Sequence, residues 1–125
     1  HELLPQVDLL SLHIPMRESN RHIIGAKEIA LMKRNAILIN VSRGGLIDEA
    51  ALFESLKNGH LFGAGLDVFE VEPPPPDYHL LSLENVVATP HAAGGTEETQ
   101  ERSALQVAQQ VIDVLAGKPP ANSVL

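Results

Sequence analysis

The 125-residue sequence contains no cysteine and no tryptophan, and aromatic residues make up only 3% of it. Without thiols, neither a disulfide framework nor a thiolate metal site is possible. Basic residues are also scarce, since 9 Lys and Arg stand against 16 Asp and Glu, for a formal net charge of -7. Nucleic acids and anionic membranes attract clustered positive charge, so this balance argues against both as partners.

Long apolar runs are missing as well. No stretch approaches the roughly 20 apolar residues of a membrane span, and no signal peptide opens the chain, so we expect a cytoplasmic protein. The length suits one small domain. The first residue is His1, and the stretch from Glu2 to Pro5 resembles the tail of an element that begins earlier. We therefore expect the chain to be a piece of a longer protein.

Short apolar runs of strand length alternate along the chain with stretches of helical periodicity. The predicted strands cover residues 8–14, 36–41, 63–69 and 85–88, and the predicted helices cover 27–33, 48–58 and 96–116. The run at 8–14 is almost continuously apolar, which is typical of a strand covered on both faces. Strands that alternate with helices in units of about 30 residues predict an α/β fold with a doubly wound parallel sheet.

Four polar residues stand at or just beyond the predicted strand ends: Arg43, Asp67, Glu72 and His91. The carboxyl ends of parallel strands meet at one edge of the sheet, where open α/β sheets bind their ligands. We therefore expect these four side chains to lie close together. Arg43 brings a planar, permanently charged guanidinium group that matches a carboxylate with two parallel hydrogen bonds.

A histidine paired with a carboxylate is a general acid/base unit, because the carboxylate fixes the ring tautomer and stabilises the imidazolium form. With Arg43 holding the carboxylate of a 2-oxo acid, His91 would protonate the oxygen of the adjacent carbonyl as it is reduced. A positioned acid of this kind contributes on the order of 10²–10⁴ in rate.

A structural interpretation stays open beside this one. A histidine after a strand is more often a loop or capping residue than a catalyst. In this interpretation Glu72, which precedes the proline run, is a solvated side chain, and Asp67 bonds nearby backbone amides. No histidine pair has the spacing of metal ligands on a helix together with a third ligand, so the sequence predicts no metal site.

Three motifs make the sequence resemble a known family. They are Asn-Val-Ser-Arg-Gly-Gly-Leu-Ile-Asp-Glu at 40–49, Gly-Ala-Gly-Leu-Asp-Val-Phe-Glu-Val-Glu-Pro at 63–73, and Thr-Pro-His-Ala-Ala-Gly at 89–94. In this order they closely resemble the D-isomer-specific 2-hydroxyacid dehydrogenases, and the likeness extends over essentially all of residues 1–125. It implies a Rossmann-type NAD(P)-binding domain and interconversion of a 2-oxo acid and a D-2-hydroxy acid by hydride transfer with NAD or NADP.

The resemblance also implies roles for individual residues. Arg43 would bind the substrate carboxylate and carbonyl, His91 would act as the acid/base, and Glu72 would be its partner. Related formate dehydrogenases carry glutamine at the position of Glu72, which favours a small 2-hydroxy acid as substrate, as in glyoxylate, hydroxypyruvate and phosphoglycerate enzymes. The residues implied to contact the cofactor are His13, Pro15, Val41, Ser42, Arg43, Asp67, His91 and Gly94.

One part of the family pattern is absent from these 125 residues. The cofactor domain normally begins with a strand and a Gly-x-Gly-x-x-Gly turn whose backbone amides bind the pyrophosphate. Here the pair Gly63 and Gly65 has Val68 where a third glycine belongs, and it stands before a strand instead of after one. The sequence thus resembles a domain fragment that lacks the glycine-rich first half, and we expect the isolated chain to be inactive.

The resemblance leaves three questions open. The resemblance fits a non-catalytic dinucleotide-sensing or scaffold protein of the corepressor type as well, and it fixes neither the particular 2-hydroxy acid nor NAD against NADP.

The strand at 8–14 would also present an unpaired apolar edge. We therefore expect self-association through that edge or through the last helix, with a homodimer as the assembly.

Overall fold

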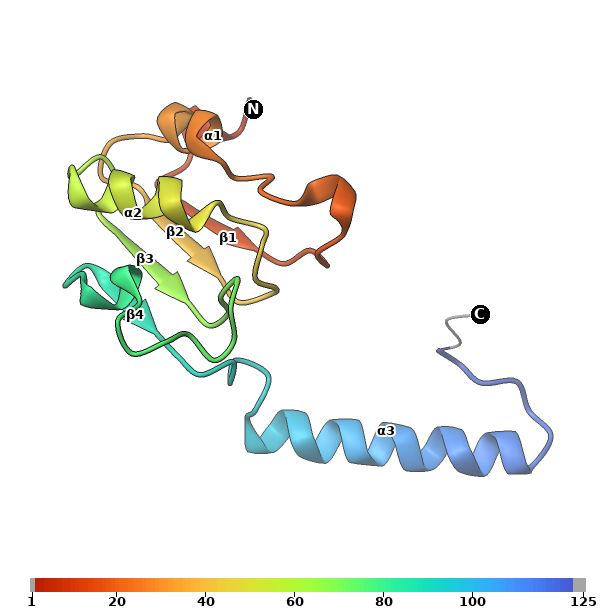
Figure 1. Ribbon diagram of the computed structural model, residues 1–125. Helices are drawn as coiled ribbons and strands as arrows, with labels where there is room; N and C mark the ends of the chain where they lie inside the picture. The colour runs from red at the N-terminus through yellow and green to blue at the C-terminus, as the bar shows by residue number, and fades with distance from the viewer. Residues whose placement is uncertain (1, 123–125) are drawn as a thin grey trace. The chain divides into compact units, whose positions relative to one another are not determined.

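The computed structural model describes residues 2–122, which form two compact units, the first ending at His91 and the second beginning at Ala92. The first unit contains one four-stranded parallel sheet in the order β1-β2-β3-β4 (Figure 1). Its strands are β1 (Leu9–Leu12), β2 (Ile37–Asn40), β3 (Gly63–Leu66) and β4 (Val86–Ala88). The predicted parallel α/β architecture is confirmed.

Two α-helices connect these strands, α1 (Ala26–Leu31) and α2 (Glu49–Lys57), together with short 3₁₀ turns at Glu18–Asn20 and His79–Ser82. A third 3₁₀ turn, Leu4–Gln6, precedes β1. Asp48 begins α2 as predicted, because its carboxylate accepts a hydrogen bond from the backbone N–H of Ala51 at 3.1 Å. The strands are shorter than the apolar runs, since pairing in β1 stops at Leu12, where its partner β2 reaches Asn40.

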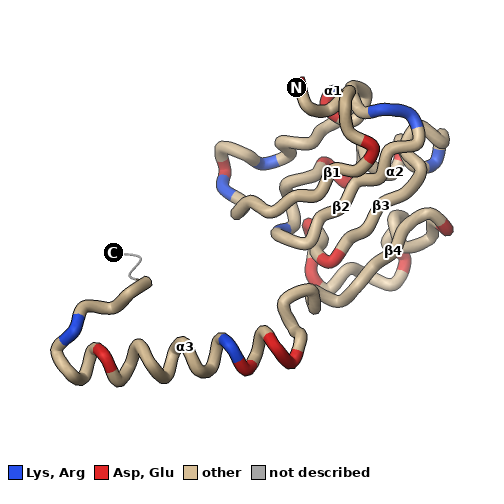
Figure 2. Tube along the Cα trace, turned by 180° about the vertical axis from the view of Figure 1, so that it is seen from behind, with Lys and Arg blue, Asp and Glu red and all other residues tan. Residues whose placement is uncertain are grey.

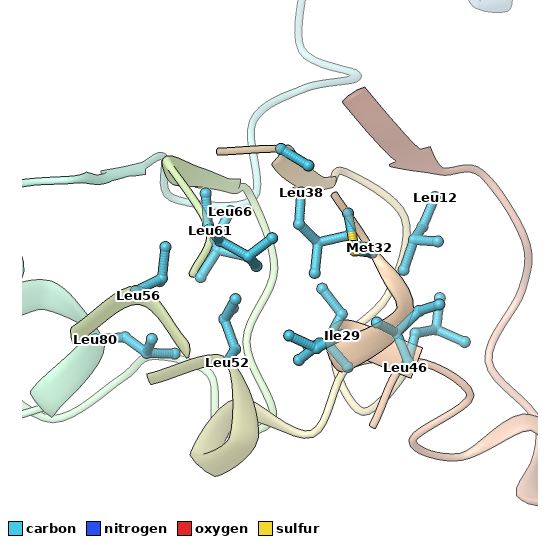
Figure 3. Packing of buried hydrophobic residues seen from close by; sticks show 14 of the residues in the cluster. Leu12, Ile29, Met32, Leu38, Leu46, Leu52, Leu56, Leu61, Leu66 and Leu80 are labelled. Atoms are coloured by element: carbon cyan, nitrogen blue, oxygen red, sulfur yellow. The ribbon is translucent and has the colours of Figure 1, made fainter. Parts of the chain in front are cut away.

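The hydrophobic core lies between one face of the sheet and the two helices. Leu12, Leu38 and Leu66 project from the strands on this face and are almost fully buried. They pack against side chains of α1 and α2 such as Ile29 and Leu52 (Figure 3). The helices of the first unit cover only this face of the sheet. The continuous apolar run at 8–14 predicted a strand that is covered on both faces. Right-handed crossovers that advance in one direction across a sheet leave their helices on the same face.

The second unit is dominated by helix α3 (Glu97–Leu115). Thr96 caps its first turn by accepting a hydrogen bond from the backbone N–H of Thr99 at 3.2 Å, and Gly117 follows its end with a positive φ of 78°. The helix matches the predicted range of 96–116 closely. Across residues 2–122, no helix has both the length and the apolar character needed to cross a membrane.

A glycine allows two loops of the first unit to meet. The turn after β2 contains Gly44, and a Cβ atom added there would lie 1.9 Å from the carbonyl oxygen of Phe69, in the loop after β3. Any side chain at this position would therefore collide with backbone. Because Arg43 precedes this contact and Glu72 follows Phe69 by three residues, the contact brings the two candidate loops together.

Replacing a core leucine tests the packing of the sheet against its helices. Leu38 is fully buried in β2, so Leu38→Ala should lower the free energy of unfolding by about 3 kcal/mol through lost burial and a residual cavity. Leu9→Ala in β1 is the matched control, because half of the Leu9 side chain is exposed. Urea denaturation of both variants measures the difference, and equal losses would contradict the described core.

Replacing Gly44 tests the contact between the two loops. Gly44→Ala should lower the free energy of unfolding by about 3 kcal/mol, because the new methyl group must displace the Phe69 carbonyl. Gly65→Ala is the control, since a Cβ there meets only Ile39 side-chain atoms at 3.6 Å and beyond. A Gly44→Ala chain that unfolds at the wild-type denaturant concentration would show that the loops do not touch.

Candidate functional site

The structure brings the predicted catalytic residues to one edge of the sheet. Arg43 follows β2, Glu72 lies in the loop after β3, and His91 stands three residues beyond the end of β4. All three line a single cavity of about 320 Å³. The other residues that line it are Met16, Arg21, Gly44, Gly45, Phe69 and Glu70. The sequence prediction that these strand ends converge is therefore correct for this set.

His91 and Glu72 form a direct pair. The Nδ1 atom of His91 lies 2.8 Å from Oε2 of Glu72, and the two side chains are 49% and 37% exposed. A carboxylate can only accept, so Nδ1 carries the proton and Nε2 is the ring nitrogen that can exchange a proton with a ligand. The pair thus has the arrangement of an oriented general acid/base.

Glu72 is held from two sides. Its Oε1 accepts a hydrogen bond from the backbone N–H of Phe69 at 3.0 Å, while Oε2 faces His91. The Phe69 N–H is the main cause that lowers the pKa of the Glu72 carboxyl, and the hydrogen bond from His91 adds to it. Glu72 is therefore favoured as a carboxylate, the form that orients a histidine.

The backbone of His91 adopts an unusual conformation. Its φ is 55°, in the left-handed region that residues other than glycine seldom occupy. Such conformations cost on the order of 1–3 kcal/mol and are concentrated at functional sites. This observation favours a functional role for His91 over the simple loop residue that the sequence left open.

The turn that carries Arg43 is fixed by Asn40, a buried residue at the end of β2. The side-chain oxygen of Asn40 accepts hydrogen bonds from the backbone N–H and the hydroxyl of Ser42, both at 3.1 Å, and its amide nitrogen donates to the Arg43 carbonyl at 2.9 Å. The Arg43 guanidinium donates to the Ser42 carbonyl at 2.6 Å. That bond uses one of its five N–H donors, so Arg43 can also bind an anion.

Asp67 belongs to a neighbouring cavity of about 430 Å³, which Glu72 and His91 also line. Asp67 is only 2% exposed and accepts a hydrogen bond from the hydroxyl of Thr89. Its backbone N–H donates to the Asn40 carbonyl at 2.9 Å, continuing the pairing of β2 and β3. Asp67 is thus adjacent to the acid/base pair on a second side.

Four other predicted cofactor residues of the first unit, His13, Pro15, Val41 and Ser42, are not among the residues that line these two cavities. His13 lies just beyond β1, where its Nε2 is 2.8 Å from the Ser11 hydroxyl, and the carbonyl of Pro15 accepts a hydrogen bond from Asn20 at 2.9 Å. Val41 and Ser42 follow β2 directly. The last predicted cofactor residue, Gly94, belongs to the second unit.

Among residues 2–122, no three His, Cys, Asp or Glu side chains come together in a way that could hold a metal ion. The acidic residues near the site are bonded to protein groups instead, as the pair of Glu72 with His91 and that of Glu70 with His22 show.

Sequence reasoning missed three groups that support the site: Asn40, Glu49 with Glu70, and Tyr78. Asn40 had a detectable signal, because a polar residue at the end of an apolar strand and before a turn commonly bonds the turn's backbone. Glu49 had none, since a carboxylate in the first turn of a helix is ordinarily explained by the helix dipole alone. Only the folded chain shows that its side chain is buried.

Comparison with known proteins points to one family. Residues 1–93 match the model of the D-isomer specific 2-hydroxyacid dehydrogenase, NAD binding domain. A D-3-phosphoglycerate dehydrogenase of Methanocaldococcus jannaschii is 51% identical over 124 residues, which are 99% of this chain and 24% of that protein. A glyoxylate reductase of Korarchaeum cryptofilum is 50% identical over 123 residues, which are 98% of this chain and 37% of that protein.

Solved structures that match the fold of this chain come from the same family. The NAD-complexed D-isomer specific 2-hydroxyacid dehydrogenase of Lactobacillus delbrueckii ssp. bulgaricus matches with a TM-score of 0.90 at 34% identity, over 99% of this chain and 42% of that one. The enzyme of Xanthobacter autotrophicus Py2, in complex with NADPH and MES, matches with a TM-score of 0.82 at 36% identity, over 99% and 52%. This chain therefore belongs to the D-isomer specific 2-hydroxyacid dehydrogenase family and matches part of its NAD-binding domain.

Proposed function

We propose that residues 1–125 form the catalytic part of an NAD(P)-binding domain in an oxidoreductase that interconverts a 2-oxo acid and a D-2-hydroxy acid. The observation that carries the proposal is the 2.8 Å contact between His91 Nδ1 and Glu72 Oε2, in the cavity that Arg43 also lines. An anion-binding guanidinium beside an oriented acid/base is the set of groups that reduction of a 2-oxo acid requires.

Each residue of this set has one task. Arg43 binds the substrate carboxylate and orients the neighbouring carbonyl group. His91 donates the proton on Nε2 to the carbonyl oxygen as it becomes an alkoxide, and it removes that proton in the reverse reaction. Glu72 keeps the proton on Nδ1 and stabilises the imidazolium form, so the ring presents Nε2 in both directions.

The chain's own residues fit the nicotinamide end of a dinucleotide. Ligands of open parallel sheets bind outside the carboxyl ends of the strands, where Val41, Ser42 and Asp67 stand. The carboxylate of Asp67 is an acceptor for an amide such as the nicotinamide carboxamide. When bound, the cofactor supplies the hydride. The glycine-rich pyrophosphate turn is not among these 125 residues, and the solved relatives with NAD and with NADPH support either cofactor.

Small 2-oxo acids are the proposed substrates, because the relatives include enzymes named glyoxylate reductase and D-3-phosphoglycerate dehydrogenase. These relatives are longer, because the chain spans 37% of the glyoxylate reductase and 24% of the D-3-phosphoglycerate dehydrogenase. Side chains that select one acid over another can therefore lie outside residues 1–125. The cytoplasmic location expected from the sequence stays a prediction.

A turnover assay tests the proposed function. NADH and NADPH consumption is measured with glyoxylate, hydroxypyruvate, pyruvate and phosphohydroxypyruvate, for this chain and for a version extended to the length of the relatives. We expect activity only in the extended version, with His91→Ala and Arg43→Ala each lowering it by about 10²–10⁴. Arg34→Ala is the control, because Arg34 precedes β2 and lies away from the strand carboxyl ends.

Two results would count against the reductase. Near-normal turnover in the His91→Ala version would remove the acid/base assignment. An extended version that binds NADH and reduces none of the four acids would favour the dinucleotide-sensing or scaffold role of the corepressor type.

We also propose that the chain self-associates, because β1 has a strand partner on one side only among the described residues and Leu9 is half exposed there. Light scattering should give the mass of a dimer. Leu9→Lys should return the monomer if β1 forms the contact, whereas Leu105→Lys should do so if α3 forms it. A monomeric mass for the unaltered chain at high concentration would contradict the proposal.

A further inference from the structure

Two glutamates beside the site exchange backbone hydrogen bonds. Glu49 opens helix α2 and is only 8% exposed. Its Oε1 accepts from the backbone N–H of Glu70 at 2.8 Å, and its Oε2 accepts from the Tyr78 hydroxyl. In return, Oε1 of Glu70 accepts from the backbone N–H of Glu49 at 3.5 Å. Burying a carboxylate costs free energy, so a buried one with both oxygens bonded has a defined structural task.

These bonds tie α2 to both sides of the loop that follows β3. This loop holds Glu70 near its start and Tyr78 near its end, and its acidic stretches are visible beyond β3 in Figure 2. Between those two residues stands Glu72, the partner of His91. The loop of the acid/base pair is therefore anchored to the helix that follows the Arg43 turn.

The anchor reaches Glu72 through a single residue, Phe69. Phe69 and Glu70 are adjacent, and the Phe69 N–H is the group that bonds Oε1 of Glu72 at 3.0 Å. Glu49 bonds the next N–H along the chain, that of Glu70. On the other side, the carbonyl of Phe69 meets Gly44. A fixed orientation of this short segment therefore fixes the donor that orients Glu72.

We propose that Glu49 is a positioning residue for the Glu72–His91 pair. Its buried carboxylate holds the Glu70 N–H and the Tyr78 hydroxyl, and so keeps the Phe69 N–H directed at Glu72. Glu49 does not touch the reacting atoms. That the Glu72–His91 pair takes part in catalysis rests on the proposed function. That Glu49 positions Glu72 does not depend on the proposed function.

The electrostatics of the cluster agree with this role. Burial raises the pKa of Glu49, and the hydrogen bonds from Tyr78 and Glu70 partly offset that effect. Burial and the neighbouring Glu49 carboxylate raise the pKa of Tyr78 far above its usual value, so its hydroxyl stays protonated and remains a donor. The side chain of Glu70 is paired with Arg21, whose Nη2 lies 3.7 Å from Oε2, and with His22, whose Nε2 lies 2.8 Å from Oε1.

Two NMR measurements on the 125-residue chain test the proposal. The first is hydrogen exchange at the Phe69 amide, which bonds Glu72 and not Glu49. The second is the carboxyl titration of Glu72, whose lowered pKa depends first on that amide. Both report on the Glu72 environment, and a change that only lowered overall stability would leave the Glu72 titration in the folded chain unmoved.

In Glu49→Ala we expect the Phe69 amide to exchange about tenfold faster, which corresponds to roughly one hydrogen bond lost. We also expect the pKa of Glu72 to rise toward its usual value. Glu54→Ala is the matched control, since Glu54 is an exposed glutamate of the same helix, and it should change neither quantity.

The conservative variant separates geometry from charge. In Glu49→Gln the amide oxygen can still accept from the Glu70 N–H, and the amide nitrogen can donate to the Tyr78 oxygen. We expect both quantities to return to wild-type values. A Glu49→Gln chain that behaves like Glu49→Ala would overturn positioning by hydrogen-bond geometry.

A folded Glu49→Ala chain with wild-type exchange at Phe69 and a wild-type Glu72 titration would also overturn the proposal. If Glu49→Ala fails to fold, Tyr78→Phe tests the proposal in its place, because it removes the hydrogen bond from the Tyr78 hydroxyl and keeps the Glu49 carboxylate. It should speed the Phe69 exchange to a smaller extent, and an unchanged rate would overturn the proposal. Faster hydrogen exchange at the Phe69 amide in these variants, together with normal turnover in the extended His91→Ala version, would contradict the proposed function. It would leave the positioning role of Glu49 supported.

Discussion

The site depends on one close backbone approach, between Gly44 in the turn after β2 and the Phe69 carbonyl in the loop after β3. Parallel strands bring their carboxyl ends to one edge but leave the following loops free to diverge. Here the absence of a side chain at Gly44 lets them touch. The approach sets the distance between Arg43 and Glu72, and hence the size of the cavity that the two share with His91.

The elements of the first unit were predictable because their signals are local. The apolar run of β2, the Asp48 cap of α2 and the glycine after that helix all appear within a few residues of sequence. Strand ends were less predictable, since they depend on where a partner strand stops. The apolar run at 8–14 continues past Leu12, but β2 offers no further pairing there.

The catalytic candidates were predictable for a related reason, because each follows a strand and the carboxyl ends of parallel strands meet at one edge of the sheet. The residues that hold them in place were not. Glu49 and Tyr78 are separated by 29 residues, and neither has a sequence pattern that links it to the other. Their contact depends on the path of the whole loop after β3. Burial, which distinguishes Glu49 from the exposed Glu54 on the same helix, exists only in the folded chain.

Acid affects the carboxylates of Glu72 and Glu49 in opposite ways. The folded-state pKa of Glu72 is lowered, so its contribution to stability is full above its unfolded pKa and is lost as pH falls through the folded value. The folded-state pKa of Glu49 is raised, so the folded chain binds that proton more tightly than the unfolded chain, and its contribution grows as pH falls. On acidification Glu49 therefore takes up its proton before Glu72. The carboxylate that faces His91 is the last of the two to be neutralised, because the Phe69 N–H is bonded to it and burial is not its main influence.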